Sequence, residues 1–315
     1  MAYGAKVLAD SLSPSGVRLT TMEVTIPRLV LAEFNTHRMF SRNSASSRAI
    51  PVEKRIQSVL GDPFVPDAFG KNKSGMQASE DLDETNTKLA REVWRLAKED
   101  ACFHANRLAK MGVHKQLANR LIEPFCWQTI IVTATEYDNF FALRRDSMAQ
   151  PEIQKPAELM YVAMQESNPR QLKHGEWHLP LLQPDELVVT DDSSEHDEQV
   201  VDGRTMLELS TAIKVSIGRC ARVSYLTHEG KRDISADVAL YDRLVSSGHM
   251  SPTEHVARPM TRDDAYLILR KQGPVSCDLS DIDVRDVFSG NFRGWMSHRK
   301  MIPGESVFVP AQQPG

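Results

Sequence analysis

The chain has 315 residues, of which 41% are hydrophobic and 25% charged, and its formal net charge is −4. This composition is typical of a globular protein with a substantial core. The negative net charge argues against a general nucleic-acid binder, which needs a basic face, but it is compatible with a local anion site.

The N-terminal segment MAYGAKVLADSLSPSG lacks the basic start and apolar run of a signal peptide. No segment has the roughly 20 apolar residues that span a bilayer, so we expect no membrane partner. The four cysteines form no CxxC pair and are predicted to be reduced core thiols. Together these features predict a cytoplasmic protein.

Strand-like and helix-like patterns alternate along the chain and predict a mixed α/β (α+β) protein. Short β-branched runs in 17–34, broken by Pro27, indicate one or two strands, and TIIVTAT indicates a buried strand at 129–135. The clearest helical spacing covers 82–111, and a helix can restart at Pro151 because proline is tolerated in a first turn. Further helices are predicted at 49–60, 112–124, 136–165, 205–225 and 236–247, with a mixed helix and loop insertion at 260–288.

One segment, residues 183–204, is acidic, polar and without periodicity. We predict an exposed connector there. It separates a first part of the core, residues 1–182, from the remainder, residues 205–315, within one catalytic domain.

Residues 36–48, THRMFSRNSASSR, concentrate hydrogen-bond donors after a predicted strand. Guanidinium groups, hydroxyls and backbone N–H groups of such a loop can surround phosphate oxygens. The alternative is a solvated, serine-rich turn before a helix.

Two arginines stand out further along the chain. Arg120, in HKQLANRLIEP, lies near a predicted helix end, where it could bind an anion or only satisfy the last carbonyls. Arg144 follows the apolar FFAL and therefore needs a partner, either a carboxylate such as Glu152 or a ligand.

Two segments near the C-terminus are also rich in polar side chains. In SSGHMSPTEH, Ser251 and Glu254 are spaced as a helix capping pair, whereas His249 and His255 fit no common metal-ligand spacing. GNFRGWMSHRKMIPGE is either a basic surface loop or a second part of an anion site.

Taken together, these segments resemble the flavin-dependent thymidylate synthase family. His37-Arg38 followed by S-x-N-x-x-S-x-R resembles the family's R-H-R signature. QLANRLIEP, NFFALR, AQPEI and HMSPTEH resemble further family segments, and together they cover most of 17–160 and 215–256.

The order of the segments differs from that of the family. CARVSYLTHEG and HMSPTEH, which come first in the family, lie here near the C-terminus, so the chain resembles a circularly permuted, virus-like member. Permutation is tolerated where the two ends of a domain lie close together. FRGWMSHRKMIPGE resembles a degenerate second copy of the signature.

The resemblance implies transfer of a one-carbon unit from methylenetetrahydrofolate to C5 of dUMP, with FAD as cofactor and NADPH as reductant. It implies a mixed sheet flanked by helices, a homotetramer, and the host cytoplasm as location if the protein is viral. Arg144 would be catalytic, at the uracil N3–O2 edge. The nucleotide would be held by Ser44, Ser46, Arg48, Arg120 and Arg144. FAD would be bound by His37, Arg38, Asn43, Asn139, His249 and Ser251, and by Arg293, His298, Arg299 and Glu305 from the second copy.

Four positions depart from the family pattern: Thr36, Ser44, Thr133 and Thr135. Arg293, His298 and Glu305 are the candidates to replace the missing groups. Three other functions remain open: C5 hydroxymethylation of dUMP or methylation of dCMP, a nucleotide-binding protein without flavin chemistry, and a zinc hydrolase built on His249 and His255.

Overall fold

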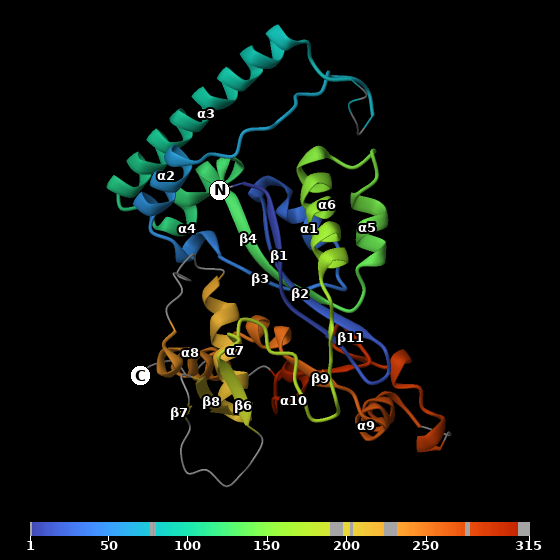
Figure 1. Ribbon diagram of the computed structural model, residues 1–315. Helices are drawn as coiled ribbons and strands as arrows, with labels where there is room; N and C mark the ends of the chain where they lie inside the picture. The colour runs from blue at the N-terminus through green and yellow to red at the C-terminus, as the bar shows by residue number, and fades with distance from the viewer. Residues whose placement is uncertain are drawn as a thin grey trace.

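The structure is a computed structural model that describes residues 2–75, 78, 80–189, 198–201, 204–223, 232–274 and 278–307. A central sheet carries helices on one face and at one end, and the C-terminal part of the chain packs beside it (Figure 1). The predicted mixed α/β class is confirmed.

The central sheet has five strands in the order β3-β4-β2-β1-β5. Neighbours are antiparallel except β5, which is parallel to β1, so the sheet is mixed. Its strands are β1 (Gly4–Leu12), β2 (Arg18–Pro27), β3 (Ser41–Ser44), β4 (Trp127–Ala134) and β5 (Arg170–Gln171). The strand predicted at 129–135 is confirmed as β4, and the run at 17–34 is one strand followed by helical turns.

Three helices, α1 (Leu31–Asn35), α5 (Asp138–Arg144) and α6 (Pro151–Glu166), enclose the main apolar core with β2 and β4. Phe34, Phe40 and Phe140 are buried at its centre with mutual ring contacts. Helix α6 begins at Pro151, as predicted. Proline is tolerated there because it lacks a backbone N–H, and N–H groups in the first turn have no carbonyl partner within the helix.

A second group of helices lies at the far end of the sheet (Figure 1). It consists of α2 (Val52–Gly61), α3 (Glu84–Lys110), α4 (Lys115–Ala118) and the 3-10 helix η3 (Asn119–Phe125). The helix predicted at 82–111 is confirmed as α3, although three of its spaced apolar residues, Leu89, Val93 and Leu96, are exposed.

The C-terminal part contains helices α7 (Leu209–Val223), α8 (Ile234–Ser246), α9 (Arg262–Gln272) and α10 (His298–Met301). Two short antiparallel pairs complete it: β9 (Ala257–Pro259) with β12 (Trp295–Ser297), and β10 (Phe288–Ser289) with β11 (Phe292–Arg293). The short 3-10 helices are η1 (Arg28–Val30), η2 (Ser47–Ala49), η4 (Ser251–His255), η5 (Leu279–Asp281) and η6 (Val284–Asp286).

The prediction of an exposed connector at 183–204 is wrong for the described residues. Strands β6 (Glu186–Val189), β7 (Glu198–Val201) and β8 (Arg204–Glu208) form a three-stranded sheet. One of the acidic residues that suggested exposure, Glu186, is in fact buried with a cationic partner. Both of its carboxylate oxygens accept hydrogen bonds from Arg219 of α7, at 2.6 and 2.7 Å. Strand β8 also occupies the start of the helix predicted at 205–225, and DDSSEHDEQ lies mostly outside the described residues.

Helices α7 and α8 are in close contact at Gly218. The buried guanidinium of the next residue, Arg219, also bonds Asp237 of α8 at 3.1 Å. A Cβ at position 218 would lie 2.5 Å from the backbone oxygen of Asp237, so glycine is required by the contact rather than by backbone conformation.

We therefore expect Gly218→Ala to destabilise the protein by roughly 1–3 kcal/mol, because the two helices must separate to admit the methyl group. Urea unfolding measures the change. Gly61→Ala is the matched control, since a Cβ there meets nothing within 4 Å. Equal unfolding midpoints for the two variants would contradict the proposed helix contact.

A buried chain of polar side chains ties the sheet to the C-terminal part. Thr21 and Thr133, on β2 and β4, are 2.7 Å apart. His178 Nε2 lies 2.8 Å from the Thr21 hydroxyl, and His255 Nδ1 lies 2.8 Å from the Thr133 hydroxyl. Ser11 closes the chain at His178 Nδ1. Segments distant in sequence are thus joined through one solvent-free network.

Candidate functional site

The segment 36–48 is not the open loop that its composition suggests. It forms a turn, strand β3 along the edge of the sheet, and the 3-10 helix η2. Arg42 fixes the turn by donating to three carbonyls, those of Asn35, His37 and Phe40, at 3.1, 3.2 and 3.1 Å. Burial lowers the pKa of Arg42, against the opposing effect of the Glu254 charge. A guanidinium so constrained keeps a fixed position beside its neighbour Arg38.

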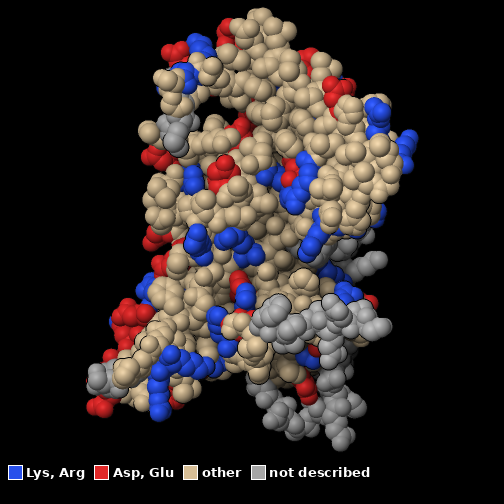
Figure 2. All heavy atoms as spheres, turned by 180° about the vertical axis from the view of Figure 1, so that it is seen from behind, with Lys and Arg blue, Asp and Glu red and all other residues tan. Residues whose placement is uncertain are grey.

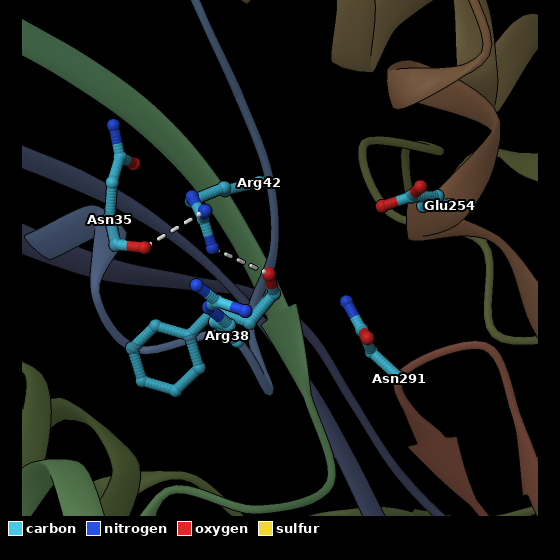
Figure 3. A pocket seen from close by; sticks show the side chains of 6 residues that line it. Asn35, Arg38, Arg42, Glu254 and Asn291 are labelled. Carbon is cyan, nitrogen blue, oxygen red and sulfur yellow. Dashed lines mark hydrogen bonds between the residues drawn. The ribbon is translucent and has the colours of Figure 1, made fainter.

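A cavity of 560 Å³ lies where the turn at residues 36–40, called here the signature turn, meets the C-terminal part. Arg38 and Arg42 project from one side, while Glu254 and Asn291 stand on the other (Figure 3). Arg38 has no hydrogen bond or ion pair within the part of the chain that the structure describes. Its guanidinium is therefore available to a ligand.

The opposite wall is held by a series of ion pairs. Arg299 binds Glu254, and its Nε lies 2.8 Å from Glu305, which also pairs with Lys300 at 2.5 Å. Although burial alone would raise the pKa of Glu305, the two cations hold that pKa below its usual range. Asn291 Nδ2 donates to the Ser41 hydroxyl at 3.3 Å, which joins the wall to β3.

His37 and Arg144 meet although 107 residues separate them. Arg144 Nε donates to His37 Nε2 at 2.8 Å, and Arg144 Nη2 contacts the Thr36 hydroxyl at 3.4 Å. Burial, and then the charges of Arg144 and Arg42, lower the pKa of His37 to about 4. A neutral His37 is thus the acceptor, so the partner of Arg144 is neither Glu152 nor any other carboxylate of the described chain.

A third cluster surrounds Glu123 at the end of η3. Glu123 accepts from Arg28 and Arg120, each at 2.9 Å, and from the Ser47 hydroxyl. Burial alone would raise the pKa of Glu123, but these bonds and charges outweigh it and lower the pKa. Arg120 therefore pairs with a carboxylate rather than capping carbonyls. Arg48 is exposed beside this cluster, because Asn119 fixes η2 by donating to Ser47 and Ile50.

The remaining predicted residues of the first signature and of η4 are dispersed. Asn43 donates to the carbonyl of Cys220 at 3.0 Å and so faces α7, whereas Ser44 and Ser46 are half-buried along β3 and η2. Asn139 is exposed at the start of α5. His249 and Ser251 are exposed before and within η4. The predicted capping pair is wrong, because Met250 precedes the turn and Ser251 makes no capping bond.

The second, degenerate signature is divided between different surroundings. Arg293 Nε pairs with Glu136 at 2.5 Å, and its backbone N–H donates to the Thr135 hydroxyl at 3.1 Å. His298 is largely buried, 3.1 Å from the Tyr241 hydroxyl, and burial lowers its pKa to about 4. Only Arg299 reaches a residue of the cavity wall, through Glu254. The basic surface loop considered for this segment is replaced by short strands with a buried Trp295.

Sequence reasoning missed part of the cavity lining. Arg42 and Glu254 stand within the recognised motifs, so their spacing could have identified them. Asn35 lies outside the quoted motifs, and Asn291 lies in GNFRGWMSHRKMIPGE but was not singled out there as a site residue. Thr133, a departure from the family pattern, is fully buried in the polar chain and is therefore unavailable to a ligand.

Positive charge predominates among these clusters. Eight cationic side chains (Arg28, Arg38, Arg42, Arg48, Arg120, Arg144, Arg299 and Lys300) accompany three carboxylates, Glu123, Glu254 and Glu305, although the whole chain is negative. Lys and Arg side chains also lie across the middle of the face opposite to that of Figure 1 (Figure 2). Such local excess of positive charge attracts anionic ligands.

Neither a metal site nor a membrane-spanning helix is found among the described residues. Within the described residues no cluster of three or more histidine, cysteine, aspartate or glutamate side chains could hold a metal ion. His255, one of the two histidines considered for zinc, bonds Thr133 instead. None of the described helices is both long and apolar enough to cross a membrane.

The family profile described as thymidylate synthase complementing protein (Thy1) matches residues 12–170. The chain belongs to this family of flavin-dependent thymidylate synthases and is an enzyme. No curated protein matches the chain.

Two solved structures are similar over half of the chain. The UMP/dUMP methylase PolB from Streptomyces cacaoi bound with 5-Br UMP is 18% identical, with a TM-score of 0.45, over 52% of this chain and 88% of that one. The same protein bound with 5-Br dUMP gives 16% identity and a TM-score of 0.42, over 52% and 90%.

Proposed function

We propose that this enzyme transfers a one-carbon unit from methylenetetrahydrofolate to C5 of dUMP, giving dTMP, with FAD as cofactor and NADPH as reductant. Membership of the Thy1 family supports this reaction class. The observation that carries the proposal is Arg144, whose guanidinium is held in place by His37 and Thr36.

Arg144 is proposed to contact the uracil ring at its N3–O2 edge. Nε is occupied by His37 and Nη2 contacts Thr36, but each Nη carries two N–H groups, so both Nη atoms can still donate to two acceptors side by side, an arrangement suited to a planar edge. A fixed cation there favours the ring in its N3-deprotonated form and so places negative charge on the pyrimidine. His37 supports this role only while neutral, which its lowered pKa ensures at physiological pH.

The residues around the cavity fit a flavin dinucleotide in the chemistry of their donors. Arg38 is unpaired and Arg42 is fixed beside it, so the two can face the oxygens of a diphosphate, while Asn291 and Glu254 can bond a ribose or a base. When bound, FAD would carry the hydride and one-carbon chemistry. The chain's own residues would bind it, orient it and hold the nucleotide against it.

The nucleotide phosphate is proposed to bind at Arg48 and Arg120, with Ser44 and Ser46 alongside. Both arginines are exposed, and Arg120 could exchange part of its contact with Glu123 for a phosphate oxygen. His37, Asn43, Asn139, His249, Ser251, Arg293, His298, Arg299 and Glu305 remain proposed cofactor contacts, of which Arg299 and Glu305 act here through Glu254.

We also propose that the chain is circularly permuted within one catalytic domain. Contacts between the central sheet and the C-terminal part support this arrangement: Asn43 and Ser41 of β3 with Cys220 and Asn291, and Thr133 of β4 with His255. A homotetramer and a cytoplasmic location, in the host if the protein is viral, stay predictions.

A second substrate, dCMP, is also compatible with the proposed contact between Arg144 and the N3–O2 edge of the base. Cytosine presents N3 and O2 as two acceptors, so Arg144 could equally orient dCMP for methylation, and a hydroxymethyl product is compatible with the same site. Product analysis by mass spectrometry with dUMP and dCMP separates these reactions.

The absorbance spectrum of the purified protein tests cofactor and substrate together. We expect an oxidised flavin spectrum that shifts when dUMP is added, because both ligands share one site. Arg38→Ala should weaken FAD binding by about 10-fold or more, since a charge-assisted bond to phosphate is lost. Arg91→Ala, which removes an exposed arginine from α3, is the control. A wild-type protein that binds dUMP but takes up no FAD would reject the flavin proposal.

A further inference from the structure

Arg42 lies on β3, two residues after the signature turn, at a position that the motif leaves open. Its side chain folds back over the turn. Nη1 donates to the carbonyls of His37 and Phe40, at 3.2 and 3.1 Å, and Nη2 donates to that of Asn35 at 3.1 Å (Figure 3). Three of the five N–H groups of this guanidinium are therefore committed to backbone carbonyls.

The backbone bonds of the turn itself are long. The N–H of His37 donates to Phe34 at 3.3 Å, and the N–H of Phe40 donates to His37 at 3.2 Å. Helix α1, which leads into the turn, has five residues and is too short to be stable alone. The three bonds from Arg42 are charge-assisted and span the turn from its start to its end. Arg42 thus fixes the backbone position of His37.

The ring of His37 is fixed from another direction. Phe140 packs against it edge to face, with ring centroids 4.9 Å apart, and Phe40 lies 6.0 Å away. With its backbone held by Arg42 and its ring by these aromatic contacts, His37 directs Nε2 at Arg144, whose Nε donates to it at 2.8 Å. The position of the Arg144 guanidinium therefore depends on Arg42 through His37.

Arg42 also acts on His37 by its charge. The charged groups around the turn are Arg38, Arg42 of β3, Arg144 of α5 and, across the cavity, Glu254 of η4, whose charge acts on Arg42. After burial, the charges of Arg144 and Arg42 are the causes that lower the pKa of His37 to about 4. Because His37 accepts from Arg144 only while it is neutral, both effects of Arg42 favour the same bond.

The signature turn has Thr36 where the R-H-R signature has its first arginine. The Thr36 hydroxyl donates to the Glu33 carbonyl at 2.6 Å and lies 3.4 Å from Arg144 Nη2. Although Thr36 carries no charge, Arg42 brings a second guanidinium to the cavity beside Arg38. Two arginines therefore still line the cavity at this turn, one of them supplied by the strand that follows.

We propose that Arg42 is a positioning residue, which fixes the signature turn so that His37 holds Arg144 at the pyrimidine edge. It supplies the second arginine of the turn in place of Thr36. The claim about the turn is independent of the reaction. The claim about the pyrimidine edge rests on the proposed function, and it requires that the effect of Arg42 on turnover pass through Arg144.

Amide hydrogen exchange of the full chain without ligands tests the first claim. In Arg42→Gln, peptides covering 34–40 should exchange at least about 10-fold faster than in wild type, because the turn opens more often. Arg42→Lys should behave alike, since one ammonium cannot bond three carbonyls in the geometry of a guanidinium. Arg285→Gln, which removes an exposed arginine paired with Asp283, is the matched control and should leave these peptides unchanged. Wild-type exchange in Arg42→Gln would overturn the proposal.

The wild-type protein gives a second readout if Arg42→Gln does not fold. By NMR, the Nη protons of Arg42 should exchange with water at least about 10-fold more slowly than those of the exposed Arg38, because three of them are hydrogen-bonded. Equal exchange rates for the two side chains would count against a fixed guanidinium.

Turnover with dUMP at saturating FAD tests the second claim. Arg42→Gln should lower kcat by about 10-fold or more, but it should lower kcat no further when Arg144→Ala is already present, because residues that act through one another are not additive. An equal loss in both backgrounds would show a general structural effect and overturn the claim. Wild-type turnover in Arg144→Ala alone would reject the proposed function and this second claim with it, while hydrogen exchange would still decide the first.

Discussion

Arg144→Ala is expected to lower kcat by about 100-fold to 1000-fold while FAD binding is retained. The variant removes a fixed positive charge from the pyrimidine edge, an effect of the size seen when one preorganised donor is lost from an active site. Steady-state turnover with dUMP, together with the flavin spectrum, measures the two properties separately.

The neighbouring Arg145 provides the control for Arg144. It lies next in the chain but pairs with Glu158 at 2.6 Å, away from His37. Arg145→Ala should therefore retain turnover close to wild type. Arg144→Lys should recover little activity, because an ammonium group cannot bond His37 and two ring acceptors in one plane. Wild-type turnover in Arg144→Ala would reject the catalytic assignment.

Protonation of His178 and His255 is expected to lower the free energy of unfolding by roughly 4 kcal/mol between pH 7 and pH 5, in addition to the contributions of His37 and His298, whose pKa values are also lowered. Burial is the first cause that lowers the pKa of His178 and of His255, each to about 3. In the unfolded chain these residues titrate near 6.5. Between pH 6.5 and pH 5 the unfolded state therefore binds protons at these histidines and the folded state does not. The stability that depends on their neutral form is present above pH 6.5 and is lost as pH falls below it.

Urea unfolding at pH 7, 6 and 5 measures this dependence. His178→Gln removes one of these groups and should reduce the change by roughly 2 kcal/mol, whatever its effect on stability at pH 7. His174→Gln, an exposed histidine nearby in sequence, should leave the change unaltered. Equal stability at pH 7 and pH 5 would contradict this prediction, because it would mean that His178 and His255 can be protonated in the folded protein.

Elements with strong local patterns could be predicted from the sequence. The 27 residues of α3 repeat a helical spacing, and Pro151 marks the start of α6. Short strands could not, because β6 and β12 exist only through partners elsewhere in the chain. The burial of Glu186 in particular depends on Arg219, which no local pattern reveals.

The candidate site divides in the same way. His37 and Arg38 can be recognised because they stand in a dense polar motif, and Arg144 because it follows the apolar FFAL. The bond between His37 and Arg144 requires α5 to lie beside the signature turn, which only the tertiary fold provides. Asn291 and the ion pairs behind Glu254 come from the C-terminal part, where the sequence indicated the residues without their mutual arrangement.

The bond from Asn43 to the Cys220 carbonyl spans 177 residues and has a consequence for synthesis. A ribosome that adds 5–20 residues per second needs about 10 to 35 s to pass from one partner to the other. During that interval the edge strand β3 has emerged without the segments that cover it. A chaperone that binds exposed edge strands is therefore expected to protect the nascent chain until α7 is complete.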